Sequence, residues 1–439
     1  MGTSSGASRA DIEICKAVIG SALKNRLFTV MSMTAGAQPA RPSGRHEGAA
    51  GPGSLRRTIM KLEQSIFVPG KGWQVLPDSD NVVNPQLVLF FGSNEFLATD
   101  QHYENIRNLY PNADIVGCST AGEILGSKTH DDTVVASAIE FENSESRVAT
   151  LLLSDVTSSY HAGASLGARL ARPDLQAVIV VSDGINVNGS DLVRGMMSTV
   201  GQRVPISGGL AGDADRFAET LVACNGSPEK GRIAAIGLYG ESIQVGHGSV
   251  GGWTGFGPQR EITKSEGNVL FELDGRPALD LYKTYLGDEA ANLPSSALNF
   301  PLMVRSPGQK CDGLVRTILA IDEEARSMTF AGDVPQGHSA QLMHANIQNL
   351  IDGAASAAQE AMSLKPNGRQ LALLVSCVGR KIVLGERASE EVEAVTNLVG
   401  SATARIGYYS YGEISPAEQG GFSELHNQTM TITLLTEHI

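Results

Sequence analysis

The stretch Ile115-Val116-Gly117-Cys118-Ser119-Thr120-Ala121-Gly122-Glu123 begins as an apolar strand and continues into small and polar residues. The same form recurs in Val180-Val181-Ser182-Asp183-Gly184 and in Pro205-Ile206-Ser207-Gly208-Gly209-Leu210-Ala211-Gly212-Asp213. In open α/β sheets, ligands bind outside the carboxyl ends of strands. We therefore predict an α/β sheet in which these three strand ends line one crevice. For any one of these stretches taken alone, a tight turn without a ligand is the commoner explanation.

Small side chains at such strand ends let a ligand reach backbone N–H groups directly. The residues that we expect to bind a ligand are Cys118, Ser119, Thr120, Asp183, Gly208, Gly209 and Asp213.

Outward from these stretches, apolar runs of strand length alternate with helical patterns from residue 84 to about residue 255. A second array of the same kind follows the glycine-rich residues 246–257. Such alternation is typical of layered α/β proteins. Residues 134–153 have the pattern of an antiparallel hairpin, and residues 339–364 have the pattern of one long helix. The predicted fold class is therefore α/β, with two tandem α/β domains and mixed sheets.

Composition excludes several classes of protein. The chain has 439 residues, 42% of them hydrophobic and 18% charged, so it can form packed cores and is not mainly disordered. The net charge of the chain is −13, so the chain lacks the positive charge that attracts the phosphate backbone of a nucleic acid. We therefore expect no nucleic-acid partner. No run of about 18 apolar residues is present, so we expect no insertion into a membrane.

The five cysteines are scattered and form no C-x-x-C pair. This pattern indicates neither a disulfide framework nor a structural zinc site, and it favours a reducing cytoplasm. The histidines show no H-x-x-x-H or H-E-x-x-H spacing, so we expect no metal site.

Residues 1–60 differ from the rest of the chain. They carry eight Lys or Arg against three Asp or Glu, and residues 32–58 are rich in Gly, Pro, Ala, Ser and Arg. A disordered leader, a non-native leader ahead of Met60, and a basic helix that touches a membrane surface all fit this composition. We expect residues 32–58 neither to pack on the domains nor to take part in ligand binding.

An enzymatic alternative rests on the same first stretch. Gly117-x-Ser119-x-Ala121 approaches the G-x-S-x-G nucleophile elbow, and Asp183 and His247 follow it in the chain order of an α/β-hydrolase triad. The last small position is Ala, however, and no upstream H-G-G-G motif is present. Cys118 is the other candidate nucleophile, although a Cys at the end of an apolar strand is more often an inert small hydrophobe.

Several motifs together resemble the FIST sensory family. The resemblance to its N-terminal domain is carried by residues 117–124, 207–213 and 272–278. The resemblance to its C-terminal domain is carried by Ser376-Cys377-Val378-Gly379-Arg380, by residues 407–416 and by Leu425-His426-Asn427-Gln428-Thr429. On this basis residues 84–280 are identified as the FIST N-terminal domain and residues 281–435 as the FIST C-terminal domain.

The resemblance implies a cytoplasmic signal-transduction sensor, not an enzyme, that binds a small ligand such as an amino-acid-like metabolite. It implies regulation of a separate partner, a histidine kinase or a cyclic-di-GMP enzyme. One branch of the family senses nitric oxide through haem. If this chain belongs to that branch, His247 is our candidate axial ligand, because Gly246 and Gly248 leave room for a porphyrin.

Overall fold

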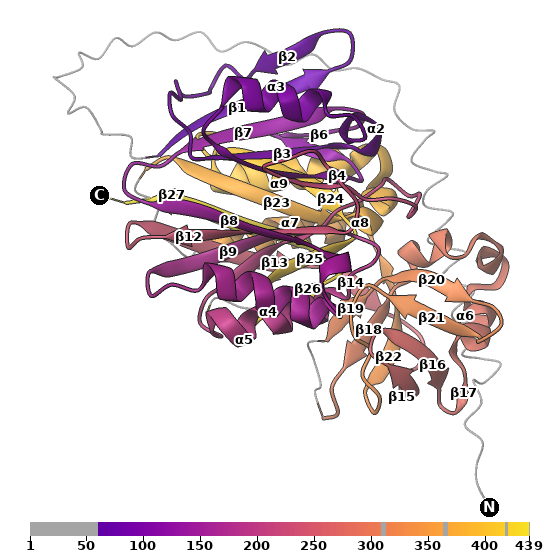
Figure 1. Cartoon of the computed structure of the whole chain (residues 1–439). Helices are drawn as coiled ribbons and strands as arrows, with labels where there is room; N and C mark the ends of the chain where they lie inside the picture. Colours follow the sequence, from indigo (N-terminus) through magenta and orange to yellow (C-terminus); the bar gives the residue numbers. More distant parts are fainter. Residues whose placement is uncertain (1–59, 309–312, 363–367, 418–419, 439) are drawn as a thin grey trace, which may run out of the picture.

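The computed structural model describes residues 60–308, 313–362, 368–417 and 420–438. These residues form a body of three six-stranded sheets and a smaller lobe, residues 251–345, which Figure 1 shows beside the body. The predicted α/β class with mixed sheets is confirmed. Residues 1–59, which hold the predicted leader, lie outside the described residues.

The three sheets of the body share one plan. The strands of the first sheet, in spatial order, are β11 (Val222–Cys224), β4 (Asp114–Thr120), β3 (Leu87–Ser93), β7 (Val134–Glu140), β1 (Lys61–Val68) and β2 (Gly72–Val75). Those of the second are β26 (Ser423–His426), β25 (Gly412–Pro416), β10 (Ile206–Leu210), β9 (Leu175–Ser182), β12 (Arg232–Tyr239) and β8 (Glu145–Leu152). Those of the third are β13 (Ile243–Val250), β27 (Met430–Glu437), β23 (Gln370–Cys377), β24 (Ala404–Ser410), β5 (Glu123–Leu125) and β6 (Lys128–His130).

Each sheet has one parallel pair among its inner strands: β3 with β4, β9 with β10, and β23 with β24. Each also receives a short antiparallel strand from another part of the chain. β5 pairs with β24, β11 pairs with β4, and β25 pairs with β10. The same order and directions thus occur three times, and the three units exchange one strand each in a cycle.

The inner faces of the three sheets enclose one apolar core. Strand β23 is buried along its whole length and β9 at every residue except Gln176, which explains their nearly continuous apolar sequences. Helices cover the outer faces: α2 (Asn94–Leu97) and α3 (Gln101–Leu109) the first sheet, α4 (Ser159–Leu170) and α5 (Gly189–Val200) the second, α7 (Ile347–Ala361), α8 (Val378–Leu384) and α9 (Ala388–Val399) the third.

The lobe is an insertion between β13 and α7 with its own core. Its helix is α6 (Ala278–Leu286). Its strands are β14 (Trp253–Gly255), β15 (Arg260–Glu266), β16 (Val269–Leu273), β17 (Arg276–Pro277), β18 (Leu302–Arg305), β19 (Leu314–Arg316), β20 (Ile318–Asp322), β21 (Ser327–Phe330) and β22 (Ser339–Ala345). The chain enters the lobe at Gly251 and leaves it at Asn346.

Two predictions about local structure are wrong. Residues 134–153 do not form a hairpin: β7 lies between β1 and β3, whereas β8 pairs with β12 in a different sheet. Residues 339–364 are not one helix, because residues 339–345 form β22, and helix α7 begins only after Asn346. The Asn346 side chain caps α7 by accepting a hydrogen bond from the Gln348 N–H.

Candidate functional site

The structure brings the predicted strand ends together and buries them. Cys118, Ser119 and Thr120 end β4, Gly208 and Gly209 lie in β10, and Asp183 and Asp213 follow β9 and β10; all seven are buried. The Gly212 N–H donates to the Ser119 carbonyl at 2.9 Å, so the first and second sheets meet at this point.

The carboxylate of Asp183 accepts hydrogen bonds from several loops near the end of β9. Its Oδ1 accepts hydrogen bonds from the N–H groups of Ile185 and Asn186 at 2.9 and 2.7 Å. Its Oδ2 accepts from the Thr220 hydroxyl at 3.1 Å and from the Gly231 N–H at 3.2 Å. Both carboxylate oxygens are therefore engaged by the protein.

Gly208 and Asp213 also have local partners. Gly208 has a φ of +122°, and a Cβ there would overlap the Val180 carbonyl, so only glycine fits. Asp213 accepts from Arg216 Nε at 2.9 Å and from the Glu219 N–H at 3.2 Å. The space between these strand ends is thus occupied by protein groups, and ligand binding there stays a prediction.

The surroundings of the two candidate nucleophiles, Ser119 and Cys118, do not support a nucleophilic role. Ser119 Oγ is fully buried and accepts a hydrogen bond from the Leu221 N–H at 2.9 Å. Burial raises the pKa of the Cys118 thiol well above its ordinary value, which opposes thiolate formation.

His247 lies on β13, only 4% exposed, and burial lowers its pKa to about 4. The open side of Gly248 faces helix α7, since a Cβ there would overlap the Ala357 carbonyl. Gly248 thus allows helix α7 to pack closely on β13, and α7 fills the space beside this glycine that we expected for a porphyrin. These surroundings do not fit a haem, so the haem expectation stays a prediction without support from the geometry.

Two buried glutamates that we did not predict occupy equivalent positions in the first and third units. Glu123 Oε1 accepts from the Thr120 hydroxyl at 2.5 Å, and its Oε2 accepts from the Thr133 hydroxyl at 2.7 Å. Burial raises the pKa of Glu123 to about 7.

The third unit repeats this arrangement. Glu413 accepts from the Ser410 hydroxyl at 2.6 Å and from the Thr429 hydroxyl at 3.0 Å. Burial raises the pKa of Glu413 to about 8. The repeated Gly-Glu-Ile at residues 122–124 and 412–414 is the sequence signal that would have revealed both glutamates.

A cavity of about 570 Å³ lies where the lobe meets the body. Helix α5 contributes Arg194 and Met197 to its wall, the lobe contributes Arg316 and Asp333, and β26 contributes Glu424. Ligand cavities occur preferentially at such junctions between domains. None of the seven predicted residues lines this cavity.

Polar contacts across the junction hold the lobe near α5. Asp333 accepts from the side-chain amide of Asn188, the N-cap of α5, at 2.7 Å and from Arg194 at 3.0 Å. Arg316 Nη1 donates to the Leu425 carbonyl at 2.9 Å. The cavity is thus bordered by side chains of both charges, and all of these contacts join lobe to body.

Within the described ranges, no group of three or more His, Cys, Asp or Glu could hold a metal ion. No described helix is both long enough and apolar enough to span a bilayer.

The FIST N domain matches residues 86–276, and the FIST C domain matches residues 278–416. The chain belongs to the FIST family. FIST domains are sensory domains of signal transduction. No curated protein matches the chain.

Among solved structures, the chain is similar to a cyanuric acid hydrolase from A. caulinodans, with 10% identity over 67% of this chain and 100% of that one. The TM-score is 0.17, so this likeness says nothing about fold or activity.

The two FIST domains follow one another along the chain and share sheets in space. β5 of the FIST N match pairs with β24 of the FIST C match, and β10 pairs with β25. The boundary between the two matches, at residues 276–278, lies inside the lobe.

Proposed function

We propose that this FIST protein is a cytoplasmic signal-transduction sensor that binds a small ligand in the cavity between lobe and body and regulates a separate signalling partner. The observation that carries the proposal is the cavity itself, which is bordered by both parts of the molecule. A ligand that touches both parts favours one arrangement of lobe and body, and such a population shift is the physical basis of a sensor.

The wall of the cavity suits a small amphipathic metabolite. Arg194 and Arg316 supply positive charge, Asp333 and Glu424 supply negative charge, and Met197 supplies apolar surface. An amino-acid-like molecule has matching groups in its carboxylate, its ammonium and its side chain. This ligand class, which the family resemblance implies, is therefore part of the proposal.

The lobe is the element that we expect to move. It is joined to the body by two chain crossings, at Gly251 and at Asn346, and Gly252 has a φ of +87°. A change in the lobe would alter the surface presented to a partner. We propose a histidine kinase or a cyclic-di-GMP enzyme as that partner.

A thermal-shift screen of amino acids and related metabolites on the full chain tests the proposal. Met197→Trp fills the cavity and should abolish the stabilisation that an active metabolite gives to the wild type. Met362→Trp, the same change at an exposed methionine outside the cavity wall, is the matched control and should keep it.

Stabilisation that persists in Met197→Trp would reject the cavity as the site. If the same stabilisation is lost in Asp183→Ala, the ligand binds at the strand ends instead.

A further inference from the structure

Arg316 is a buried arginine whose guanidinium group has hydrogen-bond donors that no described residue accepts. It is only 4% exposed. Its Nε donates to the Asp333 carbonyl at 2.9 Å, and its Nη1 donates to the Leu425 carbonyl at 2.9 Å. Among the described residues, Nη2 has no hydrogen-bond partner, and no carboxylate forms an ion pair with Arg316.

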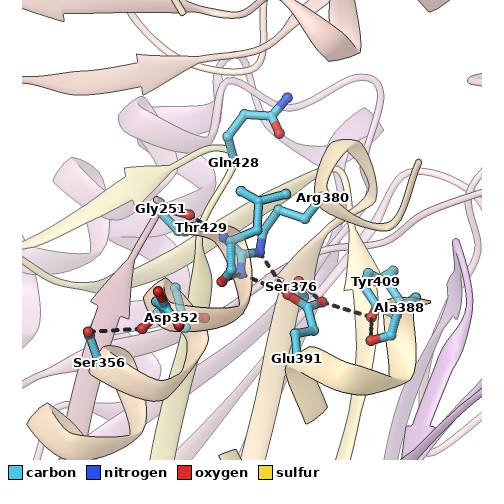
Figure 2. Close-up of polar contacts among 12 residues, drawn as sticks. Gly251, Asp352, Ser356, Ser376, Arg380, Ala388, Glu391, Tyr409, Gln428 and Thr429 are labelled. Atoms are coloured by element: carbon cyan, nitrogen blue, oxygen red, sulfur yellow. Dashed lines mark hydrogen bonds and ion pairs between the residues drawn. The ribbon is translucent and has the colours of Figure 1, made fainter. Parts of the chain in front are cut away.

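Arg380 shows how a buried arginine is satisfied elsewhere in this molecule. Its Nε and Nη2 donate to Glu391 at 3.0 and 2.7 Å, and its Nη1 donates to the Gly251 carbonyl (Figure 2). Arg380 and Glu391 are both 0% exposed, so the positive charge is neutralised where it is buried. Arg316 has only carbonyl partners, and a buried charge without a counter-ion is costly.

Arg316 faces a space that could hold the missing counter-ion, because it lines the cavity between lobe and body. Burial lowers the pKa of Arg316 to about 10, so the side chain stays protonated at neutral pH. Glu424 and Asp333 act on it only through longer-range attraction. Asp333 already accepts hydrogen bonds from Asn188 and Arg194.

The rest of the wall favours an anion with an apolar part. Val304, Leu314 and Leu425 give apolar surface, and Ser190 and Ser423 bring hydroxyl groups. Guanidinium groups bind carboxylates through strong charge-assisted hydrogen bonds.

We propose that Arg316 is the anion-binding residue of the cavity and that it binds the carboxylate of a small amphipathic ligand through Nη2. The proposal rests on the cavity being the ligand site, as proposed above. Because Arg316 belongs to the lobe and its Nη1 is bonded to Leu425 of the body, a carboxylate bound there strengthens the contact between the two parts.

The test uses the full chain and three pairs of probes of nearly equal shape: hexanoate and hexanamide, benzoate and benzamide, succinate and succinamide. At millimolar concentration, at least one carboxylate should raise the Tm of the wild type by roughly 1–3 °C, and its amide should not. Arg316→Gln should weaken the binding of that carboxylate, measured by calorimetry, by roughly tenfold or more. Arg326→Gln removes a positive charge of the lobe that is paired with Asp280 outside the cavity wall and is the matched control, which should keep most of the affinity.

Three results would overturn the assignment: no carboxylate acts, each amide acts as well as its acid, or Arg316→Gln binds the carboxylate as tightly as the wild type. If Arg316→Gln does not fold, a crystal structure of the wild type with the active carboxylate decides, since its oxygens must lie on Nη2 of Arg316. If neutral metabolites stabilise the wild type but not Met197→Trp, while no carboxylate acts, the cavity keeps its proposed role and only the inference about Arg316 fails.

Discussion

Glu413, like Glu123, is a buried carboxyl, and one such side chain makes the stability of the protein depend on pH. The Glu413 carboxyl is 0% exposed, and burial raises its pKa to about 8 from an ordinary value of 4.5. Below pH 4.5 the carboxyl is protonated in both the folded and the unfolded chain. Between pH 4.5 and about 8 the unfolded chain loses this proton while the folded one keeps it, so stability falls as pH rises.

Glu413→Gln removes this fall in stability with pH, because an amide does not ionise in this pH range. The glutamine amide can still accept a hydrogen bond from Thr429 and donate one to Ser410. We expect the variant to gain stability over the wild type as pH rises from 4 to 9, by on the order of a few kcal/mol at the upper end. Urea unfolding at several pH values measures the difference. Glu241→Gln, at an exposed glutamate, controls for the loss of one charge. A difference that does not change with pH would show that Glu413 ionises as it does in water.

Helix α7 and strand β13 show that neighbouring residues in sequence do not reveal what packs against a strand. The run Gly246-His247-Gly248 predicted an open approach to an imidazole, yet Gly248 lies under the backbone of α7. The glycine allows the helix to pack closely on the strand, and sequence spacing gave no sign of this because α7 lies about 100 residues further along the chain.

Gly248→Ala should therefore lower the free energy of unfolding by roughly 1–3 kcal/mol, because its methyl group would overlap the Ala357 carbonyl. Denaturant unfolding measures the change. In Gly226→Ala, the new methyl group would have only the Cys224 carbonyl nearby, at 3.9 Å, so this control should change stability by less than about 0.5 kcal/mol. Equal stability of the Gly248→Ala variant and the wild type would mean that α7 lies further from β13.

The whole molecule depends on contacts between segments that are distant in sequence. Arg380 on α8 contacts the Gly251 carbonyl, where the chain enters the lobe, and donates to the Leu350 carbonyl of α7 at 2.7 Å. Its partner Glu391 on α9 also accepts from the Ser376 and Tyr409 hydroxyls at 3.0 and 2.8 Å (Figure 2). One buried ion pair thus ties the base of the lobe to the third sheet.

Arg380→Met should lower the free energy of unfolding by about 3–5 kcal/mol, because it leaves the Glu391 charge buried and unpaired. The double variant Arg380→Met/Glu391→Leu should regain part of that loss, since no lone charge remains. Arg147→Met breaks the exposed Arg147–Glu145 pair and, as the control, should cost less than about 1 kcal/mol. If the single and double variants unfold alike, the pair contributes through packing and not through charge.

Much of the local structure could be predicted from sequence. The helices of residues 101–109, 159–170 and 189–200 and the strands of residues 114–120 and 175–182 follow from the periodicity of their apolar residues. The FIST motifs, such as residues 117–124 and 207–213, were also visible in the printed sequence, and they identify the family. Both kinds of signal are local, so no partner segment is needed to detect them.

Strand pairing and the cavity could not be predicted in this way. Nothing near residues 123–125 indicates that they pair with residues 406–408, and nothing near Arg316 indicates that it lies beside α5 and β26. Apolar periodicity shows that a strand or helix has a buried face, but not which distant segment buries it. The exchange of strands among the three units decides which strands pair. The insertion of the lobe decides which residues line the cavity, because only the folded chain brings Arg316, Arg194 and Glu424 together.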